Sequence, residues 1–197
     1  MSIKHPIISV TGSSGAGTST VKHTFQQIFR RESVKAVTLE GDAFHRYNRK
    51  EMKKELEKRH EAGDATFSHF SFDANLLTEL EDCFRNYSEQ GTCRYRHYIH
   101  NSSEENLYGA KPGNFTKWKK FEEPSDLLFY EGLHGAVVNK EINLARYADL
   151  KIGVVPVINL EWIQKIHRDT DSRGYSTEAV TDTILRRMHA YVHCICP

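Results

Sequence analysis

Short apolar runs alternate along the chain with longer stretches in which apolar residues recur at helical spacing. The first run, residues 7–10, ends at glycines, and the second, residues 34–39, is closed by Glu40-Gly41-Asp42. Short β-branched runs bounded by turn residues predict buried strands. A spacing of three and four residues predicts an amphipathic helix. Between the two runs that spacing is kept by Val21, Phe25, Ile28 and Phe29.

The second half of the chain repeats this alternation. Residues 127–130 form an apolar run that ends at Glu131-Gly132, and residues 152–157 form a β-branched run. We expect a helix after the second run, to about Arg168, then a polar turn and another helix from Ser176. Short runs followed by helical stretches predict strands joined by helices.

Two further segments complete the pattern. Asn48 begins a charged helix, and Glu51 stands three residues later, in the position of a capping box. Residues 86–125 are rich in Tyr, Arg, His, Gly and Pro and are expected to be irregular. Together the elements predict an α/β fold, with a mostly parallel sheet flanked by helices. We expect residues 1–197 to form a single domain, with ligands at the carboxyl ends of its strands.

Composition narrows the functional classes. The net charge of +1 gives no reason to expect a nucleic-acid or acidic-membrane partner. The N-terminal sequence HPIISV lacks the flank of a secretion signal, and no apolar stretch approaches a membrane span, so a cytoplasmic protein is expected. Reduced thiols are therefore expected at Cys83, Cys93, Cys194 and Cys196.

A glycine-rich loop follows the first predicted strand. It fits the phosphate-loop pattern G-x-x-x-x-G-K-[ST], except that Thr18 stands where lysine is usual. Glycines allow backbone N–H groups to surround phosphate oxygens, and the Ser19 hydroxyl can ligate Mg²⁺ of a bound ATP. The alternative is a plain glycine turn between a strand and a helix. The nucleotide-binding candidates are Gly12, Ser13, Ser14, Gly15, Ala16, Gly17, Thr18, Ser19 and Thr20.

Asp42, His45 and Arg49 follow the second predicted strand at spacings of three and four. If the chain turns helically there, the three side chains share one face. A carboxylate beside a phosphate loop can take a proton from a substrate hydroxyl. His45 and Arg49 could then bind an anionic part of the acceptor. The alternative is an acidic turn residue with solvated basic neighbours.

Two more groups of charged residues accompany strand or helix ends. Glu131 ends the third strand and is a candidate ligand of Mg²⁺, or else an ordinary strand-end acid. Lys165, Arg168 and Asp169 share one helical face, and Arg173 is expected in the turn that follows. Such cations could neutralise charge on a transferring phosphoryl group in place of the loop lysine. The alternative is a helix end neutralised by Asp169.

The middle segment interleaves basic and aromatic residues. This pattern can mark a single-stranded nucleic-acid surface. The balanced net charge instead favours an anion-binding or subunit-contact loop. The residues concerned are Arg94, Tyr95, Arg96, His97, Tyr98 and His100.

Long motifs link these sites to a known family. They read HPIISVTGSSGAGTST, EGDAFHRYNR, FYEGLHG and VVPVINLEWIQKIHRDTDSRGYS, with HCI near the end. The chain resembles the bacterial phosphoribulokinases over essentially its whole length. The resemblance implies a P-loop kinase fold and MgATP-dependent phosphorylation of D-ribulose 5-phosphate at its C1 hydroxyl. The products are D-ribulose 1,5-bisphosphate and ADP, a step of the Calvin cycle.

The resemblance also implies residue roles. It places the catalytic base on Asp42, a second catalytic carboxylate on Asp169, which is also a metal candidate, and the strand-end acid on Glu131. It places an allosteric position on Arg31. Contacts to the sugar phosphate and transition state fall on His45, Arg49, Lys165, Arg168 and Arg173.

Regulation and assembly follow from the same resemblance. Bacterial members respond to NADH as activator and AMP as inhibitor, and they form homo-oligomers. The loop 12–20 contains no cysteine, so the disulfide switch of the plant-type class is not expected. Family members continue past the C-terminal end of this sequence, which suggests an incomplete chain. Two alternatives remain: a P-loop kinase of another sugar phosphate or a nucleoside, and a nucleotide-binding regulatory protein without turnover.

Overall fold

A parallel four-stranded sheet forms the centre of the computed structural model, which describes residues 5–64, 66–121 and 123–190. The order of its strands is β2-β5-β1-β6, and all three neighbouring pairs are parallel. The predicted α/β fold with a parallel sheet is confirmed. The strands are β1 (Ile7–Gly12), β2 (Ala36–Glu40), β5 (Leu127–Gly132) and β6 (Leu150–Val154).

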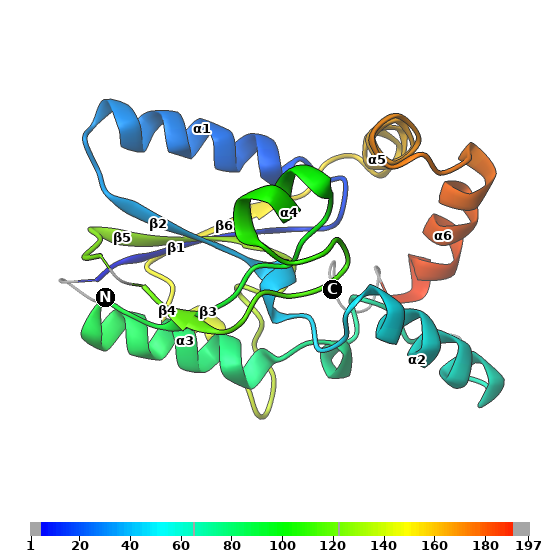
Figure 1. The fold of residues 1–197 in the computed structure, drawn as a ribbon, viewed down its shortest axis with the longest axis horizontal. Helices are drawn as coiled ribbons and strands as arrows, with labels where there is room; N and C mark the ends of the chain where they lie inside the picture. Colours follow the sequence, from blue (N-terminus) through cyan, green and yellow to red (C-terminus); the bar gives the residue numbers. More distant parts are fainter. Residues whose placement is uncertain (1–4, 65, 122, 191–197) are drawn as a thin grey trace.

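Helices cover both faces of the sheet, α1 (Thr18–Arg31) on one and α3 (Leu77–Gln90) on the other (Figure 1). Successive residues of β5 point to opposite faces. Phe129 packs in the cluster of α1, whereas Leu128 and Tyr130 pack in the cluster of α3. All three side chains are almost fully buried. Residues 127–130 of β5 are therefore apolar on both faces, as in parallel sheets covered on both sides.

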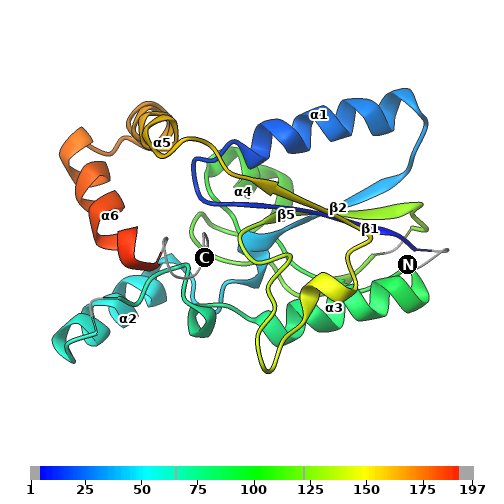
Figure 2. The same ribbon diagram turned by 180° about the vertical axis from the view of Figure 1, so that it is seen from behind.

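Three more helices lie near one another at one end of the sheet. They are α2 (Arg49–Glu61), α5 (Ile158–Arg173) and α6 (Thr177–Ala190). Figures 1 and 2 show them at the end of the molecule away from the turn between α1 and β2. Among the described residues, no helix is long and apolar enough to cross a membrane. The short elements are η1 (Gly41–Phe44), η2 (Phe72–Ala74), β3 (Arg94–Tyr95), α4 (Ser102–Tyr108), β4 (Lys119–Lys120) and η3 (Leu144–Arg146).

The predicted start of α2 is confirmed in detail. Oδ1 of Asn48 accepts a hydrogen bond from the backbone N–H of Glu51 at 2.9 Å. The Glu51 carboxylate accepts one from the backbone N–H of Asn48, also at 2.9 Å. This reciprocal pair satisfies two donors at the helix start.

Three predicted boundaries are wrong. The strand predicted at 152–157 is β6, which ends at Val154, and Pro156 follows with no N–H to donate to a ladder. Helix α5 continues to Arg173, and Gly174 ends it in the left-handed region at φ 71°. Residues 86–125 hold the last turn of α3 and several short elements, so this segment is less irregular than expected.

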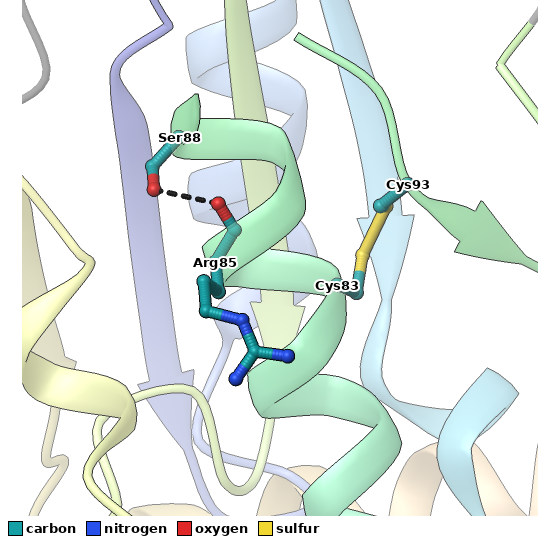
Figure 3. Close-up of a disulfide and its surroundings, with 4 residues drawn as sticks. All are labelled: Cys83, Arg85, Ser88 and Cys93. Atoms are coloured by element: carbon teal, nitrogen blue, oxygen red, sulfur yellow. Dashed lines mark hydrogen bonds between the residues drawn. A yellow bond between two sulfur atoms is a disulfide. The ribbon is translucent and has the colours of Figure 1, made fainter. Parts of the chain in front are cut away.

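The expectation of reduced thiols is wrong for Cys83 and Cys93, which form a disulfide (Figure 3). Cys83 lies on α3 and Cys93 just before β3, both are buried, and their Cα atoms are 4.8 Å apart. Helix α3 and the turn after it bring the two thiols together. The expected cytoplasmic location gives no information about this contact. The other two cysteines, Cys194 and Cys196, lie outside the described residues.

Candidate active site

The glycine loop joins β1 to α1 with its backbone curled into a turn. Ala16 donates its N–H to the Ser13 carbonyl at 3.0 Å. Gly15 and Gly17 adopt φ values of 110° and 97°, in the left-handed region where glycine is favoured. Gly17 caps the N-terminus of α1. The strand–loop–helix context required of a phosphate loop is therefore present, with the positive end of a helix dipole beside it.

Thr18, which replaces the usual loop lysine, bonds to the strand-end acid. Its hydroxyl donates to Oε1 of Glu131 at 2.5 Å. Lys22 lies one helical turn further along α1, and its Nζ is 2.8 Å from Oε1 of Glu40 and 3.7 Å from Oε2 of Glu131. Ser19 is exposed on the first turn of α1. The hydroxyl of Ser19 and the carboxylate of Glu131 are oxygen ligands of the kind that Mg²⁺ prefers.

Helix α5 lies against the loop. The Ser13 hydroxyl donates to Oε1 of Glu161 at 2.5 Å, and Nη2 of Arg168 donates to the Ser14 hydroxyl at 3.1 Å. A Cβ atom on Gly15 would lie 3.1 Å from Cβ of Lys165, so this glycine permits the close approach of the helix. The loop thus meets α5 at three consecutive residues. Glu161 is buried at this contact and was missed by the sequence analysis.

The predicted shared face of Lys165, Arg168 and Asp169 is confirmed. Asp169 accepts a hydrogen bond from Nζ of Lys165 at 2.8 Å and one from Nε of Arg168 at 2.9 Å. Burial alone would raise the pKa of Asp169, but these bonds and charges lower it. Asp169 therefore neutralises Lys165 and Arg168, as expected of a helix end neutralised by Asp169. Arg168 also contacts Ser14 of the loop. Arg173 ends α5 rather than lying in a turn, and its side chain lies outside the described residues.

Gly41, just after β2, and Gly132, the last residue of β5, allow these two strand ends to pack closely around Tyr130. A Cβ atom on Gly41 would lie 2.5 Å from the Tyr130 hydroxyl, and one on Gly132 would lie 2.6 Å from it. At either position a side chain would therefore force the Tyr130 ring or the neighbouring backbone to shift. Gly132 follows Glu131, and Gly41 precedes Asp42, so the close approach places both acids at the same edge of the sheet.

Asp42 lies among histidines. Its carboxylate is 3.2 Å from Nε2 of His45 and 3.4 Å from Nε2 of His100. Burial alone would raise the pKa of Asp42, but the neighbouring charges of His45, His100 and His69 outweigh it and hold the pKa well below its usual range. Burial would lower the pKa of His45, yet the charge of Asp42 raises it. Nδ1 of His45 lies 2.7 Å from Oδ1 of Asn75.

The expected helical face over Asp42, His45 and Arg49 is wrong, because η1 ends at Phe44 and His45 is extended. The side chains nevertheless approach the same place. Arg49 donates from Nη2 to the carbonyl of His100 at 3.1 Å, and His100 contacts Asp42. The chain therefore gathers this group by tertiary contacts rather than by helical spacing.

Arg96 of the middle segment holds the turn that carries Asp42. Its guanidinium donates to the carbonyls of Ala43 and His45 at 2.8 and 2.7 Å, and its Cζ lies 3.6 Å from the ring centre of Phe115. Burial lowers the pKa of Arg96 to about 10. With both of these donors committed to backbone carbonyls, Arg96 supports the Asp42 site, while the anion-binding or subunit-contact role expected of the middle segment stays a prediction.

Comparison with known proteins agrees with this geometry. The family model described as the phosphoribulokinase/uridine kinase family matches residues 7–197. The chain belongs to that family. Phosphoribulokinase 1 of Cereibacter sphaeroides is 73% identical over 197 residues, which are 100% of this chain and 68% of the relative. The phosphoribulokinase of Nitrobacter vulgaris is 64% identical over 194 residues, which are 98% of this chain and 67% of the relative.

A solved structure shares the fold. The phosphoribulokinase from Rhodobacter spheroides superposes with a TM-score of 0.84 at 70% identity, over 98% of this chain and 66% of that chain. The chain thus spans about two thirds of the length of these relatives, and the expectation that family members are longer is confirmed.

Within this phosphoribulokinase/uridine kinase fold, the remaining predicted position lies apart from the others. Arg31 is at the far end of α1 from the loop, 76% exposed at its side chain, and paired with Glu32 at 2.8 Å. A helix of this length places it about 20 Å from the loop. His69 and Asn75 are the residues near Asp42 that the sequence analysis missed, because only tertiary contacts bring them there.

Proposed function

We propose that this chain carries out the phosphorylation of D-ribulose 5-phosphate at its C1 hydroxyl by MgATP, giving D-ribulose 1,5-bisphosphate and ADP in the Calvin cycle. The names of the relatives and their identities of 57–73% support the substrate. One observation about the site carries the reaction type. Along the carboxyl edge of the sheet, Asp42 follows β2, Glu131 ends β5, and the glycine loop follows β1, in that spatial order.

This order fits a transfer between two bound molecules. Neighbouring strands are about 4.8 Å apart, so the Asp42 turn and the loop lie about 10 Å from each other across β5. An acceptor at Asp42 and a phosphate donor at the loop would then face each other over Glu131. Mg²⁺, when bound there, would supply positive charge that offsets the negative charge of the phosphates. Glu131 and Ser19 would hold it, with Asp169 as a further candidate.

The residues divide the remaining work. The backbone of residues 12–20 binds the ATP phosphates. Asp42 takes the proton of the sugar hydroxyl, and its lowered pKa keeps it ionised for that task at neutral pH. Lys165 and Arg168 offset the charge that develops on the phosphoryl oxygens, with Asp169 holding both side chains. The acceptor phosphate binds to His45, Arg49 and Arg173.

Asp42→Asn tests the base. Turnover should fall about 10²- to 10⁴-fold, because an amide cannot accept the proton, while ATP affinity should stay nearly unchanged. Asp82→Asn is the matched control, since the Asp82 side chain is 47% exposed against 42% for Asp42, and it lies on α3. A near-normal kcat for Asp42→Asn would remove Asp42 from the role of base.

The choice of acceptor needs a separate assay. Coupled ADP release should be measured with ribulose 5-phosphate, with another sugar phosphate and with uridine. Ribulose 5-phosphate should give the highest kcat/KM. A preference for another acceptor would keep the kinase and change its substrate. Nucleotide binding without ADP release from any acceptor would instead indicate a regulatory protein.

Regulation, assembly and location are further parts of the proposal. They rest on the family resemblance: activation by NADH and inhibition by AMP with Arg31 involved, a homo-oligomer, and a cytoplasmic location. The exposure of Arg31, far from the loop, supports a role outside the reaction itself. Arg31→Ala should change the response to NADH while leaving KM for ATP unchanged.

A further inference from the structure

Lys22 lies on α1 just after the phosphate loop, and the proposed reaction gives this residue no role. It lies four residues after Thr18 on α1, so both side chains share the face of the helix that meets the strand ends. Its side chain is only 15% exposed. A lysine this far buried needs carboxylates nearby to offset the cost of removing its charge from water.

Two carboxylates supply that compensation. Glu40 and Glu131 are register partners on neighbouring strands β2 and β5, so their side chains stand next to each other at the sheet edge. Nζ of Lys22 is 2.8 Å from Glu40 and 3.7 Å from Glu131. The ammonium group of Lys22 thus lies within ion-pair reach of both acids and offsets the repulsion between them.

Glu131 is held at both oxygens. Thr18 donates to Oε1, and Lys22 faces Oε2. A divalent cation that bound to Glu131 would meet the positive charge of Lys22 within a few ångströms. Without Lys22, the carboxyl edge of the sheet would present the carboxylates of Glu40 and Glu131 side by side without a neutralising charge. Mg²⁺ and Mn²⁺ bind readily to such a pair of carboxylates.

We propose that Lys22 is a positioning residue of the metal site, whose ammonium group neutralises Glu40 and Glu131 so that the nucleotide-free site does not hold a divalent cation by itself. The cation then enters with the nucleotide, whose phosphates add the negative charge that the site lacks. The inference rests on the proposed role of Glu131 in holding Mg²⁺. The inference also explains why threonine can replace lysine in the loop. Lys22 on α1 supplies the positive charge, and Thr18 orients the Glu131 carboxylate.

The experiment is a titration of the full chain with Mn²⁺ in the absence of nucleotide, followed by electron paramagnetic resonance of the free ion. Lys22→Met should bind Mn²⁺ at least about tenfold more tightly than the unmodified protein, because a positive charge close to the ligands is lost. Lys22→Arg should keep the unmodified affinity. Lys58→Met removes an exposed lysine paired with Glu55 on α2 and is the matched control.

Second substitutions identify the carboxylates. Adding Glu40→Gln or Glu131→Gln to Lys22→Met should remove most of the gain in Mn²⁺ affinity. Lys22→Gln, which keeps a hydrogen-bond donor but no charge, should show the same gain as Lys22→Met and replaces it if that variant does not fold.

An unchanged or weaker Mn²⁺ affinity in the folded, uncharged variants would overturn the proposal, as would a gain that survives Glu131→Gln. A merely structural role for Lys22 would lower stability without raising metal affinity. The titration needs no turnover, so it can succeed or fail independently of the assay with ribulose 5-phosphate.

Discussion

His134 should make the stability of this protein sensitive to mild acid. The side chain is only 4% exposed, and its Nε2 lies 3.1 Å from the carbonyl oxygen of Phe70. Burial lowers the pKa of His134 to about 4. A histidine in the unfolded chain has a pKa of about 6.5. The folded state therefore resists a proton that the unfolded state accepts.

The sign and size follow from linkage. Between about pH 6.5 and pH 4 the unfolded state binds one more proton, so the free energy of unfolding falls as the pH falls. The difference of about 2.5 pKa units corresponds to about 3 kcal/mol. The slope in mid-window approaches about 1.4 kcal/mol per pH unit. Stability from this group is fully present above about pH 6.5 and is lost progressively toward pH 4.

Two other perturbed groups near the site, Asp42 and His45, act outside this window, whereas burial also lowers the pKa of His97, which therefore contributes in the same direction as His134. The pKa of Asp42 is lowered, so its contribution is present above the unfolded value of about 3.9 and is lost only below it. The pKa of His45 is raised, so its contribution is present below about pH 6.5 and is lost as the pH rises through the folded value.

Urea unfolding of His134→Gln, measured from pH 4 to pH 7, tests this expectation. The amide can still donate to the Phe70 carbonyl but does not titrate, so the slope of unfolding free energy against pH should be smaller by up to about 1.4 kcal/mol per pH unit. His23→Gln, at an exposed histidine on α1, is the control and should leave the slope unchanged. Equal slopes for His134→Gln and the unmodified protein would refute the reasoning.

Three further substitutions address the loop, the strand ends and α2. Gly41→Ala should cost about 1–3 kcal/mol in urea unfolding, because its Cβ would lie 2.5 Å from the Tyr130 hydroxyl; the cost should shrink in a Tyr130→Phe background, and an equal cost in both would rule out that clash as the cause. Thr18→Val should lower kcat about tenfold by removing the hydrogen bond to Glu131, whereas Thr18→Ser should retain most activity; a normal kcat for Thr18→Val would contradict this role. Asn48→Ala should cost about 1 kcal/mol and lower the Tm by about 2–4 °C, and an unchanged Tm would show that the cap of α2 contributes nothing.

Features that depend on the spacing of residues within one short segment could be predicted from the sequence. Three such features depend only on spacing along one segment, and the structure contains all of them. They are the loop at residues 12–20, the capping box at Asn48 and the face shared by Lys165 and Asp169. Helix α3 was missed although Leu80, Phe84 and other buried residues recur on one face. Between these buried positions the helix carries polar and charged residues, together with a cysteine and aromatic side chains.

Contacts between distant segments could not be predicted in the same way. Glu161 meets Ser13 across 148 residues, and Arg96 reaches His45 across 51. No local pattern marks a carboxylate that bonds to a phosphate loop or an arginine that holds a turn. The Cys83–Cys93 pair is not predicted either, because the expectation of reduced thiols follows from the expected cellular location, whereas the disulfide depends on how α3 and the turn after it are arranged.

The contact of α5 with three consecutive loop residues has a thermodynamic consequence. Because Ser13, Ser14 and Gly15 meet Glu161, Arg168 and Lys165, a displacement of this helix changes the loop, and a ligand in the loop changes the equilibrium position of the helix. Linkage makes the two effects equal in free energy. A ligand that binds to α5, or to α6 packed against it, and favours one position of the helix would therefore alter nucleotide affinity by the same factor by which the nucleotide alters its binding.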